Sequence, residues 1–198
     1  MTASIPGAEP TVVLGAQPSL ADALASRPLP LAQALAYATQ IAGELRLMHL
    51  RDTAHGEVST ANILLGASGA TLAPSRPYVA QYKAQGDIEG WAAVLWEMLT
   101  GTTVPAQGVF RLPVAEGPRH GPESVLPSAQ RLALKCLAEI PARRPSMTQI
   151  FTEIRVLALL ARRYGLNDTP APPPPEQPSP AAEPARRWFS LGRALFGR

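Results

Sequence analysis

The segment that most constrains the fold is residues 87–101, DIEGWAAVLWEMLTG, which is apolar around most of a helical circumference. Apolar residues at steps of three and four give it one strongly apolar face, formed by Ile88, Trp91, Leu95 and Met98. A helix with so broad an apolar surface is stable in water only when other elements cover it. We therefore predict a central, buried helix that is capped by Asp87 and ended by Gly101.

Segments before this helix carry their own structural signals. Apolar residues at helical spacing predict a long helix from about Leu31 to Leu50. A shorter helix is predicted to start at Ser19, because Asp22 follows at the spacing of a capping box. A Gly-Ala-Ser-Gly turn between two short apolar runs predicts a small hairpin of Asn62–Leu65 with Ala70–Ala73.

Segments after the central helix predict two more helices. Residues 102–126 are rich in Pro and Gly, and we expect them to be irregular. One helix is predicted to start near Ser128 and to bury Cys136 as an inert core residue. The other is predicted to start at Ser146, with Gln149 completing a capping box. The fold class is therefore mainly α, with a few short strands.

The charge of the chain is unevenly distributed. The net charge is +3, but residues 185–198 hold four Arg and no acid, so the rest holds 14 basic and 15 acidic residues. A nearly neutral body argues against nucleic acid as a partner, since binding to its backbone needs a broad basic face. One cysteine, no secretory signal and no apolar stretch of about 18 residues predict a cytoplasmic location.

The C-terminal region differs in composition from the body. Residues 170–184 contain eight prolines and are expected to form an extended polyproline II linker. The following tail has helical amphipathic spacing, and two interpretations stay open. It is either an anchor for a partner or for the inner membrane surface, or an idle disordered end. The residues that would form the anchor are Arg186, Arg187, Trp188, Phe189, Leu191, Arg193, Leu195 and Phe196.

Residues 55–65, HGEVSTANILL, have the outline of a catalytic loop, with a carboxylate two residues after a His and an Asn five residues further on. LMH at 47–49 precedes this loop, and it is followed by the apolar segment 87–101 and by KCLAEIPARRPSM at 135–147. Four motifs in this order resemble the C-terminal lobe of a bacterial, eukaryotic-like Ser/Thr protein kinase. The resemblance spans roughly residues 11–164.

The resemblance implies a kinase-like fold and assigns roles to five residues. Glu57 stands at the catalytic acid and Asn62 at the metal-binding Asn of that family. His55 would pack and form hydrogen bonds, and Asp87 would fix the backbone of the loop. Arg144 would be buried, normally paired with the Glu of the APE motif. Without the resemblance, Glu57 would be read as a solvated or capping acid, and Asn62 as a side chain that satisfies backbone amides of the loop.

Several positions depart from the kinase pattern. Pro74 stands about where the family has its Mg²⁺-binding Asp, and Ser59 replaces a Lys. Gln81 or Tyr82 stands where the family has the Glu that pairs with Arg144, so Arg144 needs another partner or exposure. Few residues precede the predicted strand TVVLG, and we expect no N-terminal lobe with its phosphate-covering loop. Phosphoryl transfer depends on positioned charge, so these departures predict loss of activity.

We therefore expect a catalytically inactive pseudokinase that acts as a binding or scaffold module with protein partners and without ATP or Mg²⁺ as a cofactor. Two alternatives stay open. One is a Ser/Thr kinase completed by an N-terminal lobe that is missing here, and the other is a remnant without function. The expected organisation begins with a disordered N-terminus and a kinase-like lobe, followed by the linker and the tail; the four parts are 1–10, 11–166, 167–184 and 185–198.

Overall fold

The computed structural model describes residues 17–26, 29–74, 84–104 and 120–166. This part of the chain is mainly helical, as expected. The predicted N-terminus, the strand TVVLG, the linker and the tail lie outside the described residues, as do Gln81 and Tyr82. The helices are α1 (Leu20–Ser26), α2 (Leu31–His49), α3 (Ala84–Thr100), α4 (Val125–Cys136) and α5 (Met147–Arg163).

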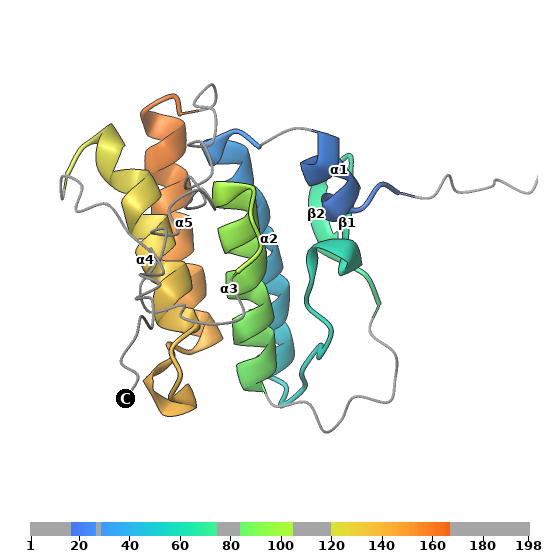
Figure 1. The fold of residues 1–198 in the computed structure, drawn as a ribbon. Coiled ribbons are helices and arrows are strands. Elements are labelled where there is room, and N and C mark those ends of the chain that lie inside the picture. Colours follow the sequence, from blue (N-terminus) through green and yellow to red (C-terminus); the bar gives the residue numbers. More distant parts are fainter. Residues whose placement is uncertain (1–16, 27–28, 75–83, 105–119, 167–198) are drawn as a thin grey trace, which may run out of the picture.

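The four long helices contact one another in a ring. α2 packs against both α3 and α5, and α4 packs against the same two helices from the other side (Figure 1). The predicted apolar face of α3 is buried, and its four residues are each at most 2% exposed. Trp91 also donates a hydrogen bond from Nε1 to the Ala38 carbonyl of α2, at 3.0 Å. The apolar segment thus forms the buried helix that its composition predicts.

Two helices begin earlier than predicted. α3 begins at Ala84, so Asp87 lies in its first turn and is not its cap. α4 begins at Val125, three residues before Ser128. Its first turn includes Pro127, and a proline is tolerated there because the first N–H groups of a helix have no intrahelical partner. Part of the stretch expected to be irregular is therefore helical, including the 3₁₀ turn η3 (Pro122–Ser124).

Two other predicted helix starts are confirmed. The Ser146 hydroxyl accepts a hydrogen bond from the Gln149 N–H, and the Gln149 Oε1 accepts one from the Ser146 N–H at 2.8 Å. This capping box starts α5. At α1, the Asp22 carboxylate accepts hydrogen bonds from the N–H and hydroxyl of Ser19 at 3.0 and 2.7 Å.

The predicted hairpin is present and packs on α2. Strands β1 (Ile63–Gly66) and β2 (Gly69–Leu72) are antiparallel, with Ile63 paired to Leu72. The Gln40 Oε1 of α2 accepts a hydrogen bond from the Ala70 N–H at 2.8 Å. Glu44, also of α2, accepts one from the Leu72 N–H at 2.9 Å. These bonds fix the position of the hairpin on α2. The hairpin in turn fixes the end of the loop that precedes β1 and the start of the chain that follows β2.

The remaining described elements are two short 3₁₀ turns. The 3₁₀ turn η1 (Thr60–Asn62) leads into β1, and η4 (Pro141–Arg143) precedes α5. In the described ranges, no helix has both the length and the apolar composition that a membrane span requires.

Candidate functional site

Asp87 of α3 is the centre of the candidate site. Its side chain is buried, and the whole residue is 1% exposed. Oδ2 accepts hydrogen bonds from the His55 backbone N–H and from His49 Nε2, both at 2.8 Å. Oδ1 accepts one from the Gly56 N–H at 2.7 Å. Because an ionised carboxylate only accepts hydrogen bonds, Nε2 of His49 carries a proton.

The surroundings of Asp87 favour its ionised form. Burial raises the pKa of the carboxyl group, since charge is less stable away from water. The hydrogen bonds from His49 and from the Gly56 and His55 N–H groups act in the opposite direction. Together these bonds outweigh burial and hold the pKa of Asp87 below its usual value. Asp87 is therefore an anion at neutral pH, and it fixes the start of the loop to α2 and α3.

His55 connects the loop to the chain that follows the hairpin. Its Nε2 lies 2.8 Å from the carbonyl oxygen of Ala73, and its Nδ1 accepts a hydrogen bond from the Glu57 N–H at 3.3 Å. A carbonyl only accepts, so the proton is on Nε2 and the ring is neutral. The side chain is buried. His55 thus holds residue 73 and residue 57 at a fixed separation.

The middle of the loop lies directly against the backbone of α3. A Cβ atom at Gly90 would be 2.6 Å from the Val58 carbonyl oxygen and 2.8 Å from the Val58 Cβ. Such distances are shorter than van der Waals contact, so only glycine fits at this position. The loop itself turns at Gly56, which has a φ of 83°.

Four positions to which the kinase resemblance assigns catalytic or metal-binding roles lie at or near this loop, namely Glu57, Ser59, Asn62 and Pro74. Asn62 donates a hydrogen bond from Nδ2 to the Glu57 carbonyl at 2.8 Å. It therefore satisfies a carbonyl of the loop, whereas the alternative interpretation expected it to satisfy backbone amides. The side chains of Glu57 and Ser59 are exposed, and Pro74 is exposed just after β2. The structure thus brings the Asn62 side chain to the Glu57 backbone. Pro74 directly follows Ala73, whose carbonyl His55 binds.

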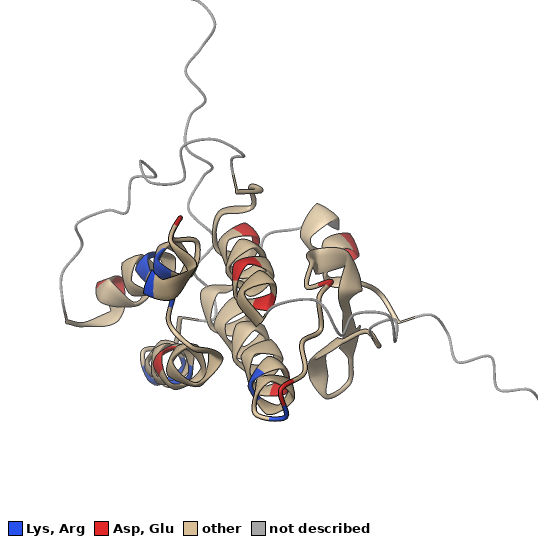
Figure 2. Ribbon diagram, turned by 90° about the horizontal axis from the view of Figure 1, so that it is seen from below, with Lys and Arg blue, Asp and Glu red and all other residues tan. Residues whose placement is uncertain are grey.

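Arg144 pairs with an acidic residue of α3 and is not exposed. Its side chain is 6% exposed, and its Nη2 forms an ion pair with Oε1 of Glu89 in α3. Its Nε donates a hydrogen bond to the Ala138 carbonyl at 2.8 Å. α3 carries acidic residues and no Lys or Arg (Figure 2). Arg144 thus attaches the connection between α4 and α5 to the same helix that holds the loop.

Sequence reasoning missed several residues of this arrangement. The sequence indicates no partner for His49, but its Nε2 binds the Asp87 carboxylate. Glu89 was not singled out, because nothing in the sequence shows that it meets Arg144. Gly90 carried a usable signal, since a glycine inside a strongly apolar helix often marks a close approach of two backbones. The predicted tail residues lie outside the described part of the chain.

No protein-family model and no curated protein matches this chain. Within the described ranges, no three His, Cys, Asp or Glu residues are grouped so that they could hold a metal ion. In the loop, a buried anion and two histidines fix the backbone, and the side chains of Glu57 and Ser59 face solvent.

Proposed function

We propose that this chain is a protein-kinase-like domain that does not transfer phosphate and that binds other proteins as a scaffold. Two findings support the kinase-like part of the proposal. The four motifs occur in the order typical of a kinase C-terminal lobe, and Asp87 holds the loop backbone as the resemblance implies. The mainly helical fold with one small hairpin is compatible with such a lobe.

The residue types at the loop support the absence of phosphate transfer. Phosphoryl transfer needs positioned cations that stabilise the charge of the transition state. The Ser59 hydroxyl has no charge, and the Pro74 side chain has no oxygen that could bind Mg²⁺. Loss of one such electrostatic group costs about 3 kcal/mol of transition-state stabilisation. Glu57 as a general base would supply only about 10²–10⁴-fold.

The observation that carries the proposal is a contrast within one loop. Residues that fix its shape are retained and engaged, namely His55, Asp87 and Asn62. Two positions that would handle phosphate or metal are replaced, since Ser59 stands where the family has a Lys and Pro74 where it has an Asp. A chain that keeps the shape of a site and loses its charges is suited to binding partners by surface contact.

The first test is a phosphorylation assay with the purified chain, radiolabelled ATP, Mg²⁺ and a generic acceptor protein. We expect no label on the acceptor or on the chain. We also expect ATP with Mg²⁺ to leave the melting temperature unchanged. Label that appears with the wild-type chain and disappears with Glu57→Ala would overturn the proposal in favour of an active kinase.

The second test addresses the scaffold role in a cytoplasmic extract. Partners captured by the full chain are identified by mass spectrometry and compared with those captured by Asp87→Asn, in which the loop is loosened, and by Asp52→Asn as the matched control. We expect a reproducible protein partner that the control retains and Asp87→Asn loses. Absence of any reproducible partner would favour the alternative of a remnant without function.

A further inference from the structure

A second surface of the molecule lies along the seam between α2 and α5. At this seam the Arg46 guanidinium lies over the Phe151 ring, 5.4 Å from its centre. The ring also lies close to Gly43, where a Cβ would be 3.3 Å from the ring edge. Phe151 therefore marks the side of α5 that lies at the seam with α2. Residues of α5 that are four residues, or about three full turns, further along the helix lie on the same side as Phe151.

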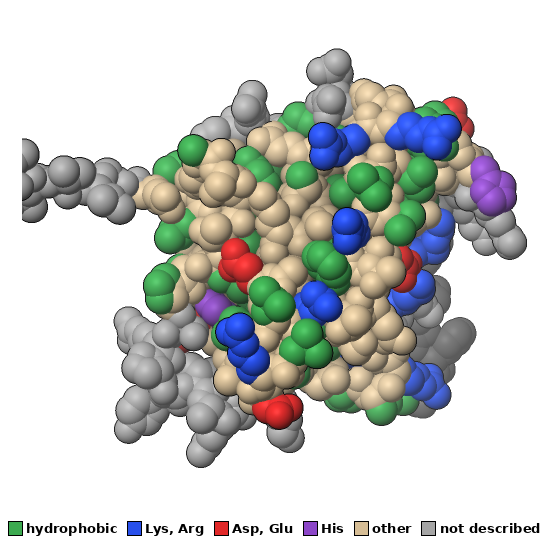
Figure 3. Space-filling model, turned by 180° about the vertical axis from the view of Figure 1, so that it is seen from behind, with side chains coloured by type: hydrophobic (Ala, Val, Ile, Leu, Met, Phe, Trp, Pro, Cys, Tyr) green, Lys and Arg blue, Asp and Glu red, His purple; other side chains and the backbone are tan. Residues whose placement is uncertain are grey.

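Helical geometry places further arginines on this side. Arg155 follows Phe151 by four residues and Arg162 follows it by eleven, so both lie within about 40° of it around the axis of α5. Both are exposed. Figure 3 shows Lys and Arg side chains in a row among hydrophobic side chains over α2 and α5. We call this surface the arginine face; it consists of Arg46, Leu50, Phe151, Arg155, Leu159 and Arg162.

The arginine face combines uncompensated positive charge with exposed apolar side chains. None of its three arginines forms an ion pair with a described residue. The acidic residues of α2 and α5 are engaged elsewhere, since Glu44 accepts from Leu72 and Glu153 pairs with Lys135 of α4. On the same face, Leu50 is 63% exposed and Leu159 is 57% exposed. Two large aliphatic side chains in water beside free guanidinium groups indicate a surface that meets an anionic, partly apolar partner.

The charge of the chain narrows the choice of partner. The tail at residues 185–198 has four Arg and no acid, so it would be repelled by this face. A second copy offers little acidic complement through α3, because Asp87 is buried, Glu89 is paired with Arg144 and Glu97 is half-buried. An anionic bilayer complements both the face and the tail, since lipid phosphates suit guanidinium groups and leucines insert beside the headgroups.

We propose that the arginine face binds the surface of an anionic lipid bilayer. Arg155 and Arg162 bind lipid phosphates, and Leu50 and Leu159 enter the boundary between headgroups and acyl chains. Each arginine near such a surface strengthens binding roughly fivefold. Binding therefore falls as ionic strength rises, because salt screens exposed charges. This proposal is independent of whether the loop transfers phosphate.

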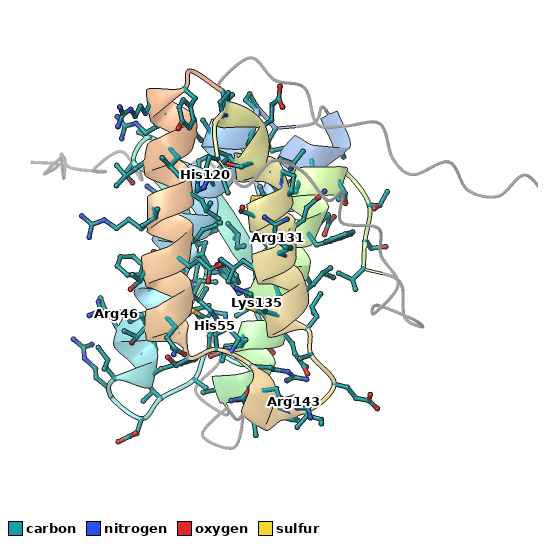
Figure 4. All side chains as sticks on the ribbon, turned by 90° about the vertical axis from the view of Figure 1, so that its left-hand side faces the viewer. Arg46, His55, His120, Arg131, Lys135 and Arg143 are labelled. Atoms are coloured by element: carbon teal, nitrogen blue, oxygen red, sulfur yellow. The ribbon has the colours of Figure 1, made fainter. Side chains whose placement is uncertain are left out.

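The test is co-sedimentation of the full-length chain with vesicles of phosphatidylcholine alone and of phosphatidylcholine mixed with phosphatidylserine. The test variant is Arg155→Gln with Arg162→Gln. The control is Arg131→Gln with Arg143→Gln, which removes the same charge; Arg131 lies on the opposite side of α5 from Arg46 (Figure 4). The tail is unchanged in both variants, and circular dichroism verifies that both are folded.

We expect binding only to the anionic vesicles, reduced roughly 25-fold by the Arg155 and Arg162 changes and much less by the control. Equal reduction by both variants would overturn the proposal, since binding would then depend on net charge. No reduction by either variant would also overturn it, since binding would then depend on the tail. Failure to bind vesicles together with binding to polyglutamate would also overturn it and would assign the face to an acidic protein segment.

Discussion

Asp87 shows how one side chain can determine the conformation of a distant segment. Its two oxygens satisfy three donors that come from two different parts of the chain. A buried carboxylate is costly unless hydrogen bonds compensate for its lost hydration. The four groups therefore depend on one another: the loop needs an acceptor, and the carboxylate needs donors. This mutual dependence makes position 87 the most sensitive residue of the candidate site.

Asp87→Asn is expected to lower the free energy of unfolding by about 3 kcal/mol. The amide nitrogen of Asn would face at least one N–H donor of His55, Gly56 or His49, leaving buried donors unsatisfied. Urea denaturation measures the effect. Asp52→Asn is the matched control, because Asp52 is exposed with a φ of 55°, which Asn tolerates well. A change at position 87 no larger than at position 52 would contradict the assigned hydrogen bonds.

Asp87 is also expected to contribute to acid unfolding. Its folded-state pKa lies below the ordinary value of 3.8, so the folded state binds this proton less readily than the unfolded state. The stabilisation by the ionised carboxylate is complete above the ordinary pKa of 3.8. It is lost as the pH falls through the lower pKa of the folded state. The stability difference between wild type and Asp87→Asn should therefore shrink as pH is lowered below about 4. A difference that stays constant in urea titrations down to pH 3 would be inconsistent with this linkage.

At the scale of elements, α3 acts as the support to which other segments attach. The loop lies on its N-terminal half, and α2 and α4 pack along its apolar surface. Its two glycines, Gly86 and Gly90, have opposite surroundings. Gly90 lies against the loop, whereas nothing lies within 4 Å of a Cβ at Gly86. The helix thus contains its own control for the effect of adding a methyl group.

Gly90→Ala is expected to lower stability by about 1–3 kcal/mol, because the new methyl group must displace the backbone at Val58. Gly86→Ala is expected to be neutral or to raise stability by up to about 1 kcal/mol, since alanine favours helix. Thermal unfolding followed by circular dichroism compares the two variants directly. If both variants shifted the melting temperature in the same direction, the contact between α3 and the loop would be in doubt.

The capping box of α5 allows a similar comparison. Ser146→Ala removes the side-chain acceptor for the Gln149 N–H and is expected to cost about 1 kcal/mol. Ser146→Gly is expected to cost only a few tenths of a kcal/mol, because glycine leaves room for water at the helix end. Denaturation midpoints of both variants measure these costs. An alanine variant as stable as wild type would show that the cap contributes nothing.

For the whole molecule, the sequence predicted which segments are helical far better than how they meet. Periodicity located α2, α3 and α5, because burial of one face imposes a spacing on apolar residues. It could not show that Arg144 meets Glu89, or that His49 meets Asp87, since those contacts depend on how the helices are packed. The early start of α4 was missed for a local reason: Pro127 reads as a breaker, although the first turn accepts it.

Cys136 reports on the integrity of the whole core. The thiol is completely buried, and burial, with a smaller effect of Glu153, raises its pKa to about 12. Since the thiolate is the reactive form, a thiol reagent should modify Cys136 only when the core opens. We expect no labelling by iodoacetamide in native buffer and complete labelling in urea, followed by mass spectrometry. Rapid native labelling would mean that α4 separates from the core without global unfolding.

The hydrogen bonds from α2 to the hairpin have a consequence for how the protein behaves at high concentration. A two-stranded ribbon normally leaves donors along its outer edge, and such edges recruit strands from neighbouring molecules. Here Gln40 and Glu44 occupy the donors of Ala70 and Leu72. α2 therefore shields β2 from templated self-assembly, and a chain that lost both side chains would be at risk of forming fibrils.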